Sequence, residues 1–330
     1  MLVLAKAMLA LMIGFILAIG SGLIIIPIMK RKKMEQSESI FLRGQHDNKK
    51  GTPTMGGFIF IIPTILTVII LLFMNKLVWS NNLFIIMFVF LAYALIGYVD
   101  DKLIIKRKNN VGLTEFQKIF AQLVVSLITF YLLMKSGHEA QLYIYSLNIK
   151  IHMGWFYGIF LLFILVASSN AVNITDGLDG LAGGLSMIVF LALGLITWNT
   201  SWLAGHQDIA IFCFILVGSL LGYLFFNTYP AKIIMGDTGS LSLGATMAII
   251  AVLTNHEVTF IILAGVFIVE TLVCIIQMFS IMVLHKKIFL MAPLHHHFEK
   301  LGYNERDIVK SFWVVGLLLA MLGVLFAVWL

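Results

Sequence analysis

Ten apolar stretches, most of them close to twenty residues long, follow one another along this chain and decide what it can fold into. An α-helix rises about 1.5 Å per residue, so roughly 20 apolar residues cross the hydrocarbon core of a bilayer. The stretches lie at 4–29, 55–75, 84–99, 116–135, 153–172, 181–198, 208–228, 239–254, 258–285 and 310–330. The ninth is long enough to tilt or break. The sequence therefore predicts an all-α polytopic membrane protein.

The composition excludes a soluble protein of this length. Hydrophobic residues make up 61% of the chain and charged residues 12%, whereas roughly a quarter of the residues of a soluble domain are charged. The first stretch is too long for a signal-peptide core and lacks a small-residue cleavage site, so we expect it to be retained. Cys213 and Cys274 both lie in apolar stretches, which favours buried thiols over disulfides or a zinc site. With no repeat and no low-complexity linker, residues 1–330 are expected to form one domain.

Basic residues are concentrated on one side of the predicted spans. The four residues from Lys30 to Lys33 are all basic and follow the first stretch, and by the positive-inside rule that end is cytoplasmic. Of the 22 lysines and arginines, 16 fall in the connections on this side, namely 30–54, 100–115, 173–180, 229–238 and 286–309. We therefore expect both termini outside. The net charge of +6 reflects this orientation and does not indicate a nucleic-acid partner.

One connection on the opposite side alternates apolar and polar residues. Between Leu142 and His152, tyrosine, asparagine and lysine alternate with leucine and isoleucine. This alternation predicts a short external β-hairpin. An irregular loop is the alternative.

Polar side chains recur every third residue where the fifth predicted span ends, at Asn170, Asn173, Asp176 and Asp179. On a helix, Asn170 and Asn173 share a face. Carboxylates and amides beside hydrocarbon are costly unless they bind a polar group or meet water. The stretch is therefore a candidate binding site, and a polar helix end that reaches the headgroup layer is the alternative.

Two adjacent carboxylates, Asp100 and Asp101, follow the third stretch. Because they repel each other, a structure that keeps both ionised needs a cation nearby. Hard oxygen ligands indicate magnesium or manganese rather than zinc, and neutralisation by Lys102 and its basic neighbours is the alternative. Lys118 and Gln122 follow at helical spacing in the fourth stretch, where the lysine either faces a bound phosphate or extends to the interface.

Three further residues on the same side are candidates. Asp237 lies among glycines and serines that allow a ligand close to its carboxylate, and capping of the eighth stretch is the alternative. Lys49 and Thr54 belong to a glycine-rich turn before the second stretch. They could meet anionic substrate groups or anionic lipid headgroups.

Three consecutive histidines, His295, His296 and His297, occupy the last connection on this side. Pro293 can start a short helix just before them. On a helix they point in three directions, so they cannot all ligate one metal ion without distortion. They are candidate donors to a phosphate or a sugar, and an ordinary surface loop is the alternative.

All of these candidates lie on the side predicted to be cytoplasmic. Carboxylates for a divalent cation, together with lysines for phosphate, predict phosphoryl chemistry at the membrane surface. A cation-coupled transporter is the alternative from another functional class. It would place ionisable groups near the bilayer midplane, whereas here they gather at one interface.

The motifs together resemble those of the polyprenyl-phosphate N-acetylhexosamine-1-phosphate transferases. The resemblance rests on Asp100-Asp101, Asn170-x-x-Asn173-x-x-Asp176-Gly, Met235-Gly236-Asp237-x-Gly239-Ser240 and Ala292-Pro293-Leu294-His295-His296-His297. The turn Lys49-x-Gly51-Thr52-Pro53-Thr54-Met55-Gly56-Gly57 and the three histidines narrow it to the MraY family of phospho-MurNAc-pentapeptide transferases. It covers nearly the whole chain. Ile234 departs from the pattern, because the family often has an aromatic residue there, associated with the nucleotide base.

The resemblance implies transfer of phospho-MurNAc-pentapeptide from UDP-MurNAc-pentapeptide to undecaprenyl phosphate, giving lipid I and UMP in peptidoglycan biosynthesis. It implies Mg²⁺ as cofactor and a homodimer in the bacterial cytoplasmic membrane. The nearer alternative is a sister transferase that uses UDP-GlcNAc. We expect Asp237 to be the principal metal ligand, together with Asp176. Asp100 is expected to activate the lipid phosphate with support from Asp101. Substrate contacts are expected from Lys49, Thr54, Lys118, Asn170, Asn173, Asp176, Gln277, His295, His296 and His297.

Overall fold

The computed structural model describes residues 3–32, 51–107, 112–144, 149–199 and 205–328. Helices make up most of these ranges. They are α1 (Val3–Arg31), α2 (Phe58–Phe73), α3 (Asn81–Arg107), α4 (Glu115–Lys135), α5 (Phe156–Thr175), α6 (Leu181–Asn199), α7 (His206–Asn227), α8 (Asp237–Leu253), α9 (Glu257–Leu263), α10 (Gly265–Phe279), α11 (Leu294–Lys300) and α12 (Glu305–Val328). The two strands are β1 (Gln141–Ile144) and β2 (Ile149–His152).

The ten predicted spans all appear as apolar helices. Among the described residues, eight helices are long and apolar enough to cross a membrane, and α2 and α8 are shorter apolar helices of 16 and 17 residues. The ninth predicted span is broken, because α9 ends at Leu263 and α10 begins at Gly265. A π-helical turn, Ser280–Leu284, then follows α10. The chain is an all-α polytopic membrane protein.

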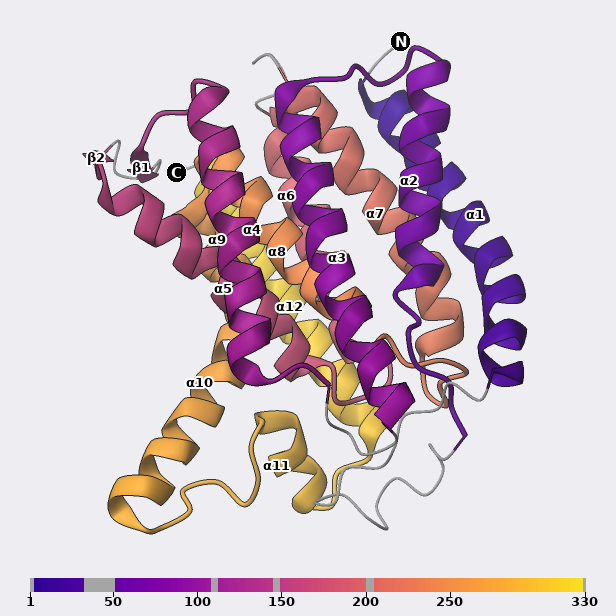
Figure 1. The fold of residues 1–330 in the computed structure, drawn as a ribbon, viewed down its shortest axis with the longest axis vertical. Coiled ribbons are helices and arrows are strands. Elements are labelled where there is room, and N and C mark those ends of the chain that lie inside the picture. Colours follow the sequence, from indigo (N-terminus) through magenta and orange to yellow (C-terminus); the bar gives the residue numbers. More distant parts are fainter. Residues whose placement is uncertain (1–2, 33–50, 108–111, 145–148, 200–204, 329–330) are drawn as a thin grey trace.

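Helix α8 lies at the centre of the bundle (Figure 1). Every residue of α8 from Thr238 to Leu253 is buried. Helices α1 and α12 instead lie at the edge and expose large apolar side chains such as Leu23 and Leu318. A helix that is apolar on all sides must be surrounded by other helices or by lipid, and both cases occur here. The central position of α8 places its first residue, Asp237, within reach of several neighbouring helices.

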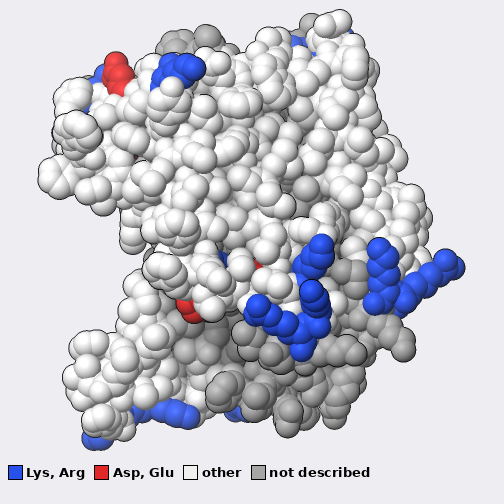
Figure 2. Space-filling view, in the orientation of Figure 1, with Lys and Arg blue, Asp and Glu red and all other residues white. Residues whose placement is uncertain are grey.

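The two ends of the bundle differ in what they carry. Both termini and the hairpin lie at one end in Figure 1, whereas α11 lies at the other. Leu142 pairs with Ile151 in the antiparallel β1–β2 hairpin, which confirms the predicted hairpin. Basic residues close α1 and α3 at the end that carries α11, and Figure 2 shows blue side chains gathered there. The outward face above them is mostly uncharged, as a lipid-facing surface requires.

Helix α3 continues to Arg107, about two turns beyond the end predicted from hydropathy. Asp100 and Asp101 therefore lie on a helix, not in a loop, and they face the start of α8. The helices approach closely at Gly97, where an added Cβ would lie 2.1 Å from the carbonyl oxygen of Asp237. No real Cβ tolerates such a distance, and the opposing atom belongs to the backbone and cannot swing away. Glycine at this position is what allows α3 to reach Asp237.

We expect Gly97→Ala to separate α3 from α8, lowering the free energy of unfolding by about 1–3 kcal/mol and greatly reducing turnover. Gly20→Ala is the matched control, because an added Cβ at Gly20 meets nothing within 4 Å. The temperature at which half of the monodisperse protein is lost on heating should fall for Gly97→Ala and stay unchanged for Gly20→Ala. Equal midpoints and equal activities for both variants would show that the close approach does not matter.

Candidate active site

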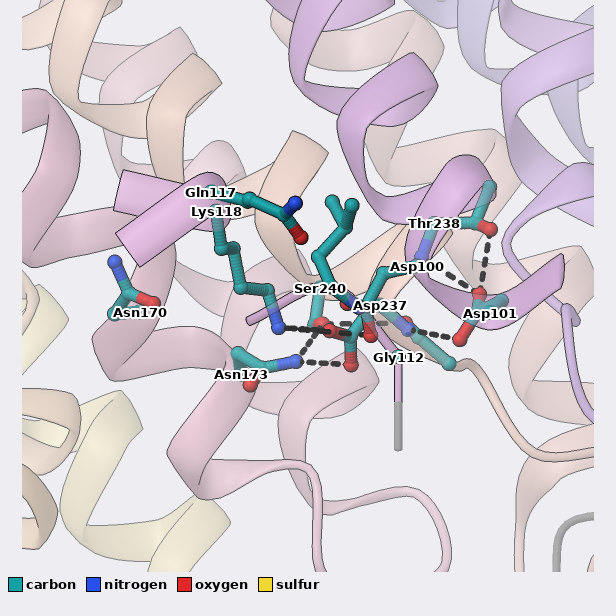
Figure 3. Close-up of polar contacts among 12 residues, drawn as sticks. Asp100, Asp101, Gly112, Gln117, Lys118, Asn170, Asn173, Asp237, Thr238 and Ser240 are labelled. Carbon is teal, nitrogen blue, oxygen red and sulfur yellow. Dashed lines mark hydrogen bonds and ion pairs between the residues drawn. The ribbon is translucent and has the colours of Figure 1, made fainter. Parts of the chain in front are cut away.

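Three carboxylates and one ammonium group meet where the end of α3 faces the start of α8 (Figure 3). Asp100 and Asp101 come from α3, Asp237 is the first residue of α8, and Lys118 lies in the first turn of α4. Asp100 and Asp101 are each only 4% exposed. Charged groups with so little contact with water need partners, and the partners of Asp100 and Asp101 come from outside α3.

Asp101 caps α8 from outside that helix. Its carboxylate accepts hydrogen bonds from the backbone N–H of Asp237 at 3.1 Å and of Thr238 at 2.9 Å, and from the Thr238 hydroxyl at 2.6 Å. The first N–H groups of a helix have no partners within it, and the helix dipole favours a negative charge there. Gly236, which precedes α8, offers no side-chain cap. Asp237 is therefore not the cap, and its side chain is free to make contacts outside α8.

The Asp237 carboxylate is held between α4 and α5. Lys118 Nζ forms an ion pair with one of its oxygens, and Asn173 Nδ2 donates to the other at 2.6 Å. Asp100 lies next to Asp237, with Oδ2 3.8 Å from Lys118 Nζ. The second oxygen of Asp100 accepts the Leu113 N–H at 2.8 Å. Lys118 thus bridges two carboxylates that would otherwise repel each other.

The cluster carries more negative than positive charge, and its oxygens suit a hard cation. Both oxygens of Asp101 accept backbone N–H groups of α8, whereas Asp100 and Asp237 each direct one oxygen toward the movable Lys118 side chain. The oxygens that could hold a metal ion therefore belong to Asp100 and Asp237. Within the described ranges, no group of three or more His, Cys, Asp or Glu side chains is arranged to hold a metal ion. Magnesium fits such an incomplete set of protein ligands, because it usually keeps several waters and binds one or two carboxylates plus substrate phosphates.

Asn170 and Asn173 share a face of α5, as predicted. Asn170 Nδ2 donates to Gln122 Oε1 of α4 at 2.9 Å, while Asn173 bonds Asp237. Asp176 is the C-cap residue that directly follows α5. Shared metal binding by Asp176 and Asp237 stays a prediction.

Thr54 lies beside Asp101 in the segment that precedes α2. A Cβ added to Gly236 would lie 2.7 Å from Asp101 Oδ2 and 3.0 Å from Thr54 Oγ1. Ile234 joins this segment to the loop before α8, since its N–H donates to the Pro53 carbonyl at 2.9 Å. The structure therefore brings Thr54 to the carboxylate cluster. Lys49 lies outside the described residues.

The three histidines lie on α11 and point to three partners, as expected for consecutive residues of a helix. His295 is fully buried, with Nδ1 3.2 Å from Glu270 Oε2. His296 Nδ1 is 2.5 Å from Glu299 Oε2, and His297 Nδ1 accepts a backbone N–H at 3.1 Å. Burial lowers the pKa of His296 below its ordinary value, although the hydrogen bond to Glu299 opposes this shift. The rings do not converge on one point, so the structure offers no three-histidine metal site here.

Gln277 lies on α10, and its amide is engaged with the backbone. Oε1 accepts the N–H groups of Ile288 at 3.2 Å and Phe289 at 3.0 Å, and Nε2 donates to the Phe289 carbonyl at 3.0 Å. The side chain thereby holds the segment that leads from α10 to α11. A contact between Gln277 and substrate stays a prediction.

Two further carboxylates support the site, Glu270, which the sequence analysis did not single out, and Asp179, whose contact it did not predict. Glu270 is buried on α10 and accepts backbone N–H groups of α11. It is the only acidic residue in the apolar stretch 258–285, and an ionisable group inside a predicted span is a functional signal that could have revealed it. Asp179 accepts the Ala231 N–H at 2.9 Å and so fixes the loop that leads to α8. That contact joins segments 52 residues apart, and no local pattern predicts it.

Comparison with known proteins identifies the family of the chain. The sequence model of glycosyl transferase family 4 matches residues 83–255, which contain most of α3 and all of α4 to α8. A phospho-N-acetylmuramoyl-pentapeptide-transferase of Geobacillus thermodenitrificans is 42% identical over 321 residues, covering 97% of this chain and 98% of that protein. A protein of the same name from Bacillus subtilis is 41% identical over 320 residues, covering 97% of each chain. The chain therefore belongs to glycosyl transferase family 4 and, within it, to the phospho-N-acetylmuramoyl-pentapeptide-transferases.

Proposed function

We propose that this protein transfers phospho-MurNAc-pentapeptide from UDP-MurNAc-pentapeptide to undecaprenyl phosphate, giving lipid I and UMP. The observation that carries the proposal is the identity of about 41–42% to transferases of that name along almost the whole chain. The cluster of carboxylates at one end of a membrane bundle supports it, because a lipid phosphate and a soluble nucleotide-sugar meet at such an interface. The whole chain, 1–330, acts as one integral membrane transferase domain.

The reaction joins two substrates that repel each other, since both carry phosphates. Lys118 pairs with both Asp100 and Asp237, and its ammonium group can also pair with an incoming phosphate. Bound by Asp237 and Asp100, a magnesium ion would neutralise phosphate charge in the same place. Asp101 keeps α8 and Asp237 in position, and Asn173 fixes the orientation of the Asp237 carboxylate. These groups are arranged before substrate arrives, which is how electrostatic catalysis works best.

The transfer needs no covalent enzyme intermediate. A monoester phosphate with a second pKa near 6 is already a nucleophile at pH 7. One of its oxygens attacks the β-phosphorus, which carries the MurNAc group, and the bond from that phosphorus to the bridging oxygen breaks. UMP leaves with the α-phosphate and the bridging oxygen. Lipid I contains the phosphate of undecaprenyl phosphate and the transferred β-phosphate. Asp100 supports this step by taking up any proton left on the lipid phosphate.

The proposal is tested by supplying purified protein with undecaprenyl phosphate and either UDP-MurNAc-pentapeptide or UDP-GlcNAc. We expect UMP and the lipid-linked product with the first nucleotide and none with the second. Turnover of UDP-GlcNAc alone would assign the sister activity. No UMP with either donor would remove the proposed function.

Turnover is expected to require a divalent cation. Chelation should abolish UMP release, because without a divalent cation the single Lys118 ammonium group cannot offset the negative charge of Asp100, Asp237 and the substrate phosphates. Added Mg²⁺ should restore UMP release. Turnover that persists at full rate after chelation, with bound metal absent by elemental analysis, would contradict the magnesium assignment.

The site is proposed to face the cytoplasm in a bacterial cytoplasmic membrane, in keeping with the basic ends of α1 and α3. Cysteine at the exposed position of Lys106 should react only with a reagent that reaches the cytoplasm, and cysteine at the exposed position of Glu139 only from outside. The reverse labelling pattern would overturn the orientation. The functional unit is proposed to be a homodimer, as in the family that the sequence resembles.

A further inference from the structure

The helix that carries the three histidines is capped by a carboxylate from another helix. Glu270 of α10 has no exposed surface, and its oxygens accept the backbone N–H groups of Leu294 at 2.8 Å and His295 at 3.2 Å. Pro293, at the N-cap of α11, provides no side-chain hydrogen bond. A buried carboxylate is costly unless donors surround it, and the first N–H groups of a helix are costly unless acceptors do. Glu270 and α11 therefore satisfy each other.

The His295 ring fills the space between Glu270 and the turn that follows α5. On one side, Nδ1 lies 3.2 Å from Glu270 Oε2. On the other, a Cβ added to Gly177 would lie only 2.2 Å from His295 Nε2. Glycine is thus the residue that lets the ring lie against this turn. Gly177 directly follows Asp176, so the location of α11 and that of Asp176 are linked through one buried side chain.

His295 differs from the next two histidines in exposure. It is fully buried, His296 is 8% exposed, and His297 is partly exposed. Because its side chain has no exposed surface, His295 can affect a bound substrate only indirectly, through the position of α11. His296 and His297 lie on the same helix and are more exposed. Figure 1 shows α11 at the end of the bundle that also holds the ends of α3 and α5, where the carboxylate cluster lies.

We propose that Glu270 and His295 are positioning residues that lock α11 onto the turn after Asp176, and thereby hold His296 and His297 in place for the nucleotide-sugar. The lock itself follows from the contacts of α10, α11 and the α5–α6 turn. The part that concerns the nucleotide-sugar rests on the proposed function. The two parts are tested by different measurements.

Hydrogen–deuterium exchange of the full-length protein tests the lock without any turnover. Glu270→Gln keeps the shape but replaces one acceptor oxygen with an NH₂ group that opposes a backbone N–H. Exchange in a peptide spanning 290–300 should become about tenfold faster. Asp307→Asn is the matched control, because Asp307 lies in the first turn of α12, is 61% exposed and pairs with Lys310 at 3.8 Å. Unchanged exchange in Glu270→Gln, or equal acceleration in the control, would overturn the lock.

Steady-state kinetics test the positioning role. Glu270→Gln should raise KM for UDP-MurNAc-pentapeptide about fivefold or more, while KM for undecaprenyl phosphate changes less than twofold. A role in stability alone would lower the active fraction and leave both KM values unchanged, which would overturn the positioning claim. Gly177→Ala drives His295 from its place without altering α10, so it should reproduce both the faster exchange and the raised KM. It also provides the test if Glu270→Gln does not fold.

A double-mutant cycle separates positioning from direct contact. If Glu270 and His295 act as one unit, Glu270→Gln combined with His295→Gln should cost little more than the worse single variant. Fully additive losses would mean that His295 acts independently, and would overturn the proposal. Wild-type protein that shows no turnover at all would remove the proposed function, and the exchange experiment alone would then decide whether the lock exists.

Discussion

Replacing Asp237 with asparagine is expected to lower kcat by about 1,000-fold, the upper range for losing one preorganised electrostatic group. The substitution removes one negative charge and nearly preserves the shape of the side chain. Asp237 is the carboxylate on which Lys118 and Asn173 converge, at the start of the most buried helix of the bundle. With asparagine, an NH₂ group would face either the Lys118 ammonium or the Asn173 amide donor. The charge proposed to bind a cation and the geometry that holds the lysine would be lost together.

The loss should appear as turnover without a matching loss of folded protein. UMP release and the midpoint of heat-induced aggregation are measured on the same preparation. Asp307→Asn serves as control, since it also replaces aspartate with asparagine in the first turn of a helix but lies on the exposed start of α12. Near-normal turnover by the Asp237 variant would remove that residue from the reaction site.

Asp101→Asn is expected to lower turnover by about 100-fold and to reduce the free energy of unfolding by about 1–3 kcal/mol. Both oxygens of Asp101 accept hydrogen bonds from the start of α8. Asparagine has one acceptor oxygen, and its NH₂ group would oppose an N–H or hydroxyl donor in a buried place. The first turn of α8 should shift, and Asp237 should shift with it.

Asp208→Asn is the comparison that isolates this effect. Asp208 also accepts a backbone N–H, from Val78 at 3.3 Å, but it lies in the first turn of α7 at the opposite end of the bundle. That variant should lose some stability and keep its kcat. If Asp101→Asn retains full turnover, or if Asp208→Asn loses as much turnover, the cap is not what positions Asp237.

The spans and the hairpin could be predicted because their signals are local. A stretch of about twenty apolar residues is expected to form a helix in a bilayer. The alternation of apolar and polar residues from Leu142 to His152 has a period of two, which is also the period with which side chains of a β-strand point to opposite faces. The break at Ala264 was foreseeable only as a consequence of the length of the stretch. The extension of α3 to Arg107 was not, because hydropathy ends a span at the first charges while the helix itself continues.

The candidate site also contains some features that have a local sequence signal and others that have none. Residue types and spacing identified Asp100, Asp101 and Asp237 as a group with one kind of chemistry. Their separate tasks depend on contacts between residues more than a hundred positions apart, such as Asp101 with Thr238 and Lys118 with Asp237. A single sequence contains no signal for such pairs. Glu270 illustrates a different case, since its carboxylate in an apolar stretch was a visible signal whose partner, α11, becomes apparent only in three dimensions.

Binding of Mn²⁺, a spectroscopically visible substitute for Mg²⁺, tests most directly whether the Asp100–Asp237 cluster is the reaction site. The purified full-length protein is titrated with Mn²⁺ in the presence of UDP-MurNAc-pentapeptide, with the nucleotide alone as the blank, and bound ion is followed by electron paramagnetic resonance. We expect one bound Mn²⁺ per chain, with an affinity that falls at least about tenfold in Asp237→Asn and does not change in Asp307→Asn. Equal Mn²⁺ affinity in wild type and Asp237→Asn would show that the Asp100–Asp237 cluster does not bind the metal ion of the reaction.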